Sequence, residues 1–125
     1  MEPTMKKRFS LAILTLSFFV PPAFAGEADV IDVQVTQSGA RTYTFDVTLS
    51  HKDTGWEHYA NKWDIIDENK VLLGTRILHH PHVNEQPFTR SLSGVEIPEN
   101  IKTVTIRAHD SVHEYGGKVV EVKLP

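Results

Sequence analysis

The sequence predicts an all-β fold, an antiparallel β-sandwich of about seven strands in a single domain. Three observations favour this class. Apolar residues recur at every second position over most of the chain, turn residues interrupt the alternation about every eight to twelve residues, and no long stretch has helical spacing. The chain has 125 residues, of which 40% are hydrophobic and 23% charged. This ordinary globular composition excludes collagen-like, coiled-coil and disordered chains.

The first 25 residues have the pattern of a secretory signal peptide. Lys6-Lys7-Arg8 form a basic start, and the apolar run that follows is about a dozen residues long. A segment that crosses a membrane needs roughly 20 apolar residues. Ala23-Phe24-Ala25 then has the small-x-small pattern of a cleavage site. We therefore expect residues 1–25 to be removed and residues 26–125 to form a periplasmic or secreted domain with no membrane segment. A retained N-terminal anchor is the alternative.

The first four strands follow in order. Residues 30–35 alternate and end before Ser38-Gly39. Residues 42–49 show the cleanest alternation in the chain, with aromatic and branched aliphatic side chains on one face. A third strand is expected over residues 59–66. A fourth covers residues 71–78, after the turn Asp67-Glu68-Asn69.

The last three strands complete the domain. Residues 88–95 predict the fifth strand and residues 118–124 the seventh. The sixth covers residues 102–108, where Val104, Ile106 and Ala108 are expected to face inward. Seven strands with these turns predict an immunoglobulin-like or fibronectin III-like sandwich.

One segment fits two kinds of secondary structure. Trp56, Tyr59, Ala60 and Trp63 have the spacing of an amphipathic helix, but Tyr59 and Trp63 also share one face of a strand. We favour the strand, because Gly55 just upstream suits a loop. Trp63 is then expected to be a buried core aromatic.

The charge and the sulfur content of the chain limit the partners and the kinds of site that the domain can have. The net charge of −3 becomes −5 without residues 1–25, because Lys6-Lys7-Arg8 outweigh Glu2 there. An acidic domain without a basic stripe argues against nucleic acid as a partner. The chain has no Cys, and both of its Met residues lie in the predicted signal peptide. The exported domain would therefore contain no sulfur and no disulfide.

The strand order predicts that all the histidines gather at one end of the sandwich. In an antiparallel sandwich of this type, the second, fourth and sixth strands end where the third begins. Every histidine of the chain stands at one of those positions: His51, His58, His79, His80, His82, His109 and His113.

A histidine-rich end of this kind predicts a site for a divalent transition metal. Imidazole is the commonest protein ligand for Zn(II), Cu(II) and Ni(II), and a chain without thiols or thioethers argues against Cu(I). Carboxylates commonly hold the second nitrogen of a ligating histidine. The candidate ligands are His51, His58, His80, His82, His109 and His113, with Glu57, Glu85 and Asp110 as supporting carboxylates, and Zn(II) or Cu(II) as the expected ion.

Two other readings remain open. Trp56, Tyr59 and Tyr115 are expected at the same end and could bind a partner protein or glycan, with the histidines serving only as polar loop residues. An enzyme is the weaker alternative, and no catalytic residue is assigned. The chain has no G-x-S-x-G elbow, phosphate loop or thiol nucleophile, which leaves only a zinc hydrolase with Glu57 or Glu85 as base.

Three segments carry a resemblance to known proteins: residues 55–63, 80–91 and 109–117. Together they resemble a family of small, exported, uncharacterised bacterial proteins with an immunoglobulin-like sandwich. The resemblance implies the fold and a periplasmic location but no activity. Glu57-His58 and Trp63 are also similar to the iron domain of superoxide reductases. Those enzymes need a cysteine iron ligand, which this chain lacks, so the activity is not carried over.

Overall fold

The computed structural model describes residues 26–125, and the predicted signal peptide lies outside the described residues. This part of the chain forms seven strands: β1 (Asp29–Gly39), β2 (Thr42–Ser50), β3 (Ala60–Ile66), β4 (Leu72–Ile77), β5 (Phe88–Glu96), β6 (Thr103–Asp110) and β7 (Val120–Lys123). Each lies within a few residues of the strand expected from the sequence. Among residues 26–125, no helix is long and apolar enough to cross a membrane.

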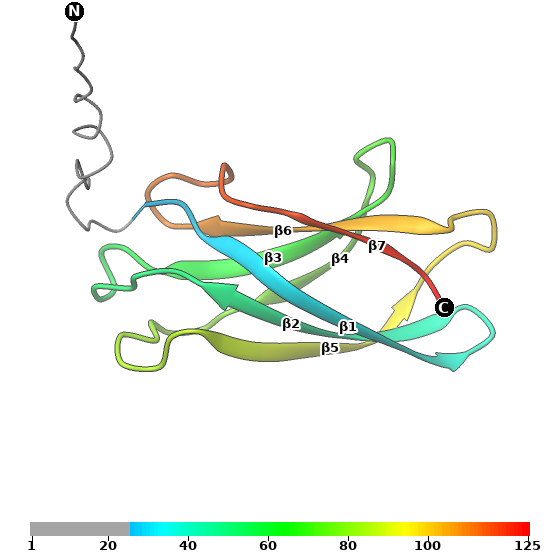
Figure 1. The fold of residues 1–125 in the computed structure, drawn as a ribbon, viewed down its shortest axis with the longest axis horizontal. Coiled ribbons are helices and arrows are strands. Elements are labelled where there is room, and N and C mark those ends of the chain that lie inside the picture. The colour runs from blue at the N-terminus through cyan, green and yellow to red at the C-terminus, as the bar shows by residue number, and fades with distance from the viewer. Residues whose placement is uncertain (1–25) are drawn as a thin grey trace, which may run out of the picture.

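The strands form two antiparallel sheets that face each other, which confirms the predicted β-sandwich (Figure 1). One sheet has the order β1-β2-β5 and the other the order β4-β3-β6-β7. Residues 56–63 do not form a helix: Trp56 lies in a turn and Trp63 in β3. The favoured strand interpretation of this segment is therefore correct.

The core lies between the sheets, where the alternating residues of each strand meet. In β2 the buried positions are Tyr43, Phe45, Val47 and Leu49, at the predicted period of two. Trp63 in the facing sheet is 0% exposed, so its predicted role as a core aromatic is confirmed.

The topology brings four chain segments to one end of the sandwich. The loops after β2, β4 and β6 lie there (Figure 1), together with the start of the described chain at Gly26. All seven histidines belong to these loops or to the strand ends beside them. The gathering predicted from the strand order is therefore present, and the next question is which rings meet.

The two tryptophans give a matched test of the core. Replacing Trp63 by Ala should lower the free energy of unfolding by about 3–5 kcal/mol, because it opens a cavity among fully buried side chains. Replacing Trp56, which is 67% exposed, by Ala should change it by less than about 1 kcal/mol. Urea unfolding measures both changes, and equal losses would contradict the sandwich core described here.

Candidate metal site

Asp110 is the centre of the histidine-rich end. It continues the inward face of β6 after Val104, Ile106 and Ala108, so the strand period directs its carboxylate into the sandwich, where it is 0% exposed. Oδ1 accepts hydrogen bonds from the backbone N–H groups of Val112, at 2.8 Å, and His113, at 2.7 Å. Oδ2 is buried and has no hydrogen-bond partner among the described residues.

The electrostatics keep Asp110 ionised. Burial alone would raise its pKa, but the backbone hydrogen bonds from His113 and Val112 and the nearby imidazoles outweigh burial and lower the pKa below the ordinary value. A buried carboxylate with one free oxygen therefore carries a negative charge that favours a cation beside it.

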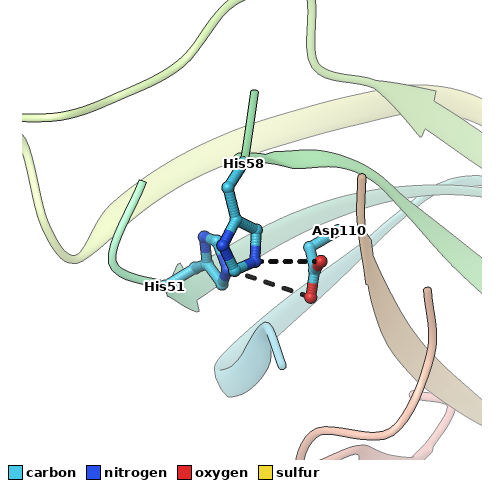
Figure 2. A group of neighbouring side chains, drawn as sticks. All are labelled: His51, His58 and Asp110. Atoms are coloured by element: carbon cyan, nitrogen blue, oxygen red, sulfur yellow. Dashed lines mark ion pairs between the residues drawn. The ribbon is translucent and has the colours of Figure 1, made fainter. Parts of the chain in front are cut away.

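Three imidazoles surround this carboxylate. Nε2 of His58 lies 3.2 Å from Oδ1 of Asp110, and Nε2 of His51 lies 3.8 Å from Oδ2 (Figure 2). Nδ1 of His113 lies 3.4 Å from Oδ2. Two ligands that share a tetrahedral ion at about 2.0–2.1 Å are roughly 3.3–3.4 Å apart. The separations between the imidazole nitrogens and the nearer oxygen of Asp110 lie on both sides of this value.

The two more buried of these three imidazoles complete a compact group with Asp110. One ligand atom from each of His51, His58 and Asp110 lies within 4.8 Å of the others, so these three residues could hold a metal ion. Nε2 of His58 is buried and, like Oδ2 of Asp110, has no hydrogen-bond partner in residues 26–125. His113 is more open, with 36% of its side chain exposed, and closes the group toward solvent.

Asp53 orients the first of these imidazoles. Its Oδ1 lies 2.5 Å from Nδ1 of His51 and also accepts the backbone N–H of Ala60 at 3.0 Å. Its Oδ2 accepts the backbone N–H of His82 at 2.7 Å. With Nδ1 held in this way, the Nε2–H of His51 donates to the carbonyl oxygen of Gly26 at 2.9 Å, and Nε2 lies 3.8 Å from Oδ2 of Asp110. A carboxylate at the other ring nitrogen is the arrangement that usually supports a metal ligand.

The same contact sets the protonation of His51. Burial lowers its pKa, but the hydrogen bond to Asp53 and the charges of Asp53 and Asp110 have the larger combined effect and raise the pKa above 6.5. Burial likewise raises the pKa of Asp53, and the bonds from His51, His82 and Ala60 reverse this and lower it. The contact therefore favours the charged form of both side chains.

Sequence reasoning did not find Asp53, and it assigned Asp110 to a supporting position. Two signals were available. His51-Lys52-Asp53 has the spacing that directs both side chains the same way in an extended segment. Asp110 falls on the inward parity of the sixth strand, where a carboxylate needs a charged or hydrogen-bonding partner.

The remaining candidate histidines do not join this group. His80 is exposed. The ring of His82 stacks on Phe88 with centroids 4.0 Å apart, and its Nε2 accepts a hydrogen bond from Arg90 at 2.8 Å. His109 faces away from the core, and its Nδ1–H donates to Asn61 at 2.6 Å.

Burial lowers the pKa of His82 and His109 below the ordinary value. The positive charge of Arg90 adds to this effect on His82, and that of Lys62 adds to it on His109. Both rings therefore favour the neutral form, and one nitrogen of each already makes a hydrogen bond, whereas both ring nitrogens of His51 do so.

The two other predicted carboxylates lie elsewhere. Glu57 accepts a hydrogen bond from the hydroxyl of Thr54 at 3.0 Å, and Glu85 is exposed in the loop between β4 and β5. Neither makes a hydrogen bond or ion pair with an imidazole in the described part of the chain. The supporting carboxylate is Asp53 in their place.

The three aromatic residues that were predicted to bind a partner lie in two different places. Trp56 packs edge-on against Tyr59, with ring centroids 5.5 Å apart. Tyr115 donates a hydrogen bond of 2.5 Å to Asp64, and Arg107 lies over its ring, 4.0 Å from the centroid. The structure thus groups Tyr115 with Asp64 and Arg107 on the four-stranded sheet.

The chain is similar to one curated protein, a "Putative lipoprotein" of Halomicrobium mukohataei. The two are 42% identical over 96 residues, which cover 77% of this chain and 47% of the relative. The chain therefore spans about half the length of the curated relative that it matches. No protein-family model matches the chain, and no solved structure does.

The charged His51–Asp53 pair predicts a specific titration in the metal-free protein. His51 should titrate above pH 6.5, while His82 and His109 should titrate below it, because their pKa values move in opposite directions. The stabilisation that His51 gains from this pair is then complete below pH 6.5 and is lost as the pH rises through the raised pKa of His51. NMR titration of the imidazole resonances measures this order, and a His51 value at or below 6.5 would contradict it.

Proposed function

We propose that this domain binds a divalent transition metal, Zn(II) or Cu(II), through His51, His58 and Asp110, with His113 as a fourth ligand. One observation carries the proposal. Oδ2 of Asp110 and Nε2 of His58 are buried in the same group and lack hydrogen-bond partners in residues 26–125. Such unpaired polar atoms are costly unless something else binds them.

The donor set matches the chemistry of these ions. Three imidazole nitrogens and one carboxylate oxygen form a mixed N/O site of the kind that Zn(II) and Cu(II) accept. A dication beside Asp110 also satisfies the buried negative charge. The raised pKa of His51 favours its protonated form, so an ion that binds this imidazole competes with a proton, and acid is expected to weaken binding.

The expected export of the domain supports the proposal. The expected signal peptide directs the domain to the periplasm or out of the cell, and the similar protein from Halomicrobium mukohataei is named a lipoprotein, a class of exported protein. We assign the domain a metal-binding role, because the group brings together donor atoms that suit an ion.

A second candidate function is partner binding through Trp56. This side chain is 67% exposed and leans on Tyr59, and Val112 on the neighbouring β6–β7 loop is 54% exposed. Exposed aromatics of this kind bind proteins or glycans. Loss of glycan binding in Trp56→Ala, measured with soluble oligosaccharides, would support this candidate independently of the metal.

Metal binding should raise the melting temperature. At a hundred times the dissociation constant, Zn(II) or Cu(II) stabilises the folded state by about 2.7 kcal/mol, which corresponds to a rise of roughly ten degrees or more for a domain of this size. The rise should disappear below about pH 5, where the imidazoles are protonated. Differential scanning fluorimetry of residues 26–125 measures it.

Variants locate that effect. His58→Ala should abolish most of the rise, because it removes a buried ligand, whereas His80→Ala should retain it, because His80 is exposed outside the group. No rise with either ion in the unmodified domain, or an equal loss in both variants, would contradict the proposed site.

The two carboxylates Asp53 and Glu57 test how the site is supported. Asp53→Asn should weaken metal binding by about 10–100-fold, because His51 loses the partner that orients it. Glu57→Gln should leave the affinity unchanged, because Glu57 bonds only to Thr54. Isothermal titration calorimetry measures both affinities. A larger loss of affinity in Glu57→Gln than in Asp53→Asn would contradict the assignment of Asp53 as the supporting carboxylate.

A further inference from the structure

We propose that Gly26 and Glu27 form a latch over the metal site. The carbonyl oxygen of Gly26 occupies the position that an ion needs at His51, so the ion binds this imidazole only after the latch has moved away. This inference rests on the proposed metal-binding function. It assigns to that site an autoinhibitory contact that lowers the affinity for the ion.

The starting observation is that both ring nitrogens of His51 are already bonded. Nδ1 lies 2.5 Å from Oδ1 of Asp53, and the Nε2–H donates to the carbonyl oxygen of Gly26 at 2.9 Å. An acceptor lies close to the direction of the N–H bond, which is also the direction in which the nitrogen lone pair would bind an ion. An ion about 2.0–2.1 Å from Nε2 in that direction would be roughly 1–2 Å from the oxygen, closer than a metal–oxygen bond of about 2.0–2.2 Å allows. The ion and the Gly26 oxygen therefore exclude each other.

The latch is attached weakly, whereas the chain directly after it is anchored. Within residues 26–125, the two residues of the latch make one hydrogen bond, the one from His51 to the Gly26 carbonyl. Ala28 is buried, and a Cβ on Gly117 would lie 2.0 Å from its carbonyl oxygen, so the two backbones are in close contact. The N–H of Val30 donates to the carbonyl of Lys118 at 2.9 Å. The latch can therefore move about this anchor while the core stays intact.

Opening of the latch changes the bonds of one nitrogen. The N–H bond at Nε2 of His51 breaks, its proton passes to water, and the ion takes the lone pair that remains. The Gly26 carbonyl loses its donor and is free to turn toward water. Nε2 of His58 and Oδ2 of Asp110 have no hydrogen-bond partner in the described part of the chain, so they need no such exchange. Because latch and ion compete for one site, each weakens the binding of the other by the same factor.

The test compares three forms of the domain that begin at Gly26, Glu27 and Ala28. All three carry an N-terminal acetyl group, so none has a free amine that could bind the ion. In the form that begins at Glu27, the acetyl carbonyl takes the place of the Gly26 carbonyl and keeps the contact with His51. In the form that begins at Ala28, this carbonyl is lost. Isothermal titration calorimetry with Zn(II) measures the three affinities, and Glu27→Gln in the second form controls for the carboxylate that the third form lacks.

We expect the form that begins at Ala28 to bind Zn(II) about three- to tenfold more tightly than the other two, because the ion no longer displaces a hydrogen bond. Equal or weaker binding by this form would overturn the latch while leaving the side-chain site intact. Absence of binding in all three forms would overturn the proposed function itself.

A second measurement needs no truncation and covers the case in which the shortest form does not fold. In NMR spectra of residues 26–125, saturating Zn(II) should remove the Nε2–H signal of His51 and increase the mobility of the latch, because the ion replaces their contact. A His51 Nε2–H signal that persists in the zinc-bound domain, with unchanged Gly26 signals, would overturn the latch.

Discussion

The arrangement of the histidine-rich end depends on the carboxylate of Asp53. It accepts hydrogen bonds from the start of β3 at Ala60, from the β4–β5 loop at His82 and from the imidazole of His51. One buried charge therefore joins three segments that are distant in the sequence. Without it, the backbone N–H groups of Ala60 and His82 would be unpaired inside the protein, and the ring of His51 would keep only its hydrogen bond to Gly26.

Gln86 strengthens this junction from the β4–β5 loop. Its side-chain oxygen accepts the backbone N–H of His51 at 3.0 Å, and its nitrogen donates to the carbonyl of His82 at 3.0 Å. The loop thereby holds the backbone of His51, while Asp53 holds its ring. A candidate ligand that is fixed in this way loses little conformational freedom when it binds an ion.

Much of the fold could be predicted from the sequence, because strand period and turn residues are local signals. Tyr43 to Leu49 alternate so regularly that their buried face was evident, and the order of strands placed all the histidines at one end. The set of rings that meet could not be derived in this way. The orientation of His82, for example, depends on its contact with the distant Asp53 and on side-chain packing against Phe88 and Arg90, and the period of the strands encodes neither.

The absence of sulfur from residues 26–125 has a consequence for how the site would age. Thiolates and thioethers are the ligands that oxidants convert to sulfenic acids, disulfides and sulfoxides, and sites built on them need enzymes to restore them. Imidazole and carboxylate donors do not enter that chemistry. A centre built from His51, His58 and Asp110 would therefore need no thiol-reducing system to restore its ligands.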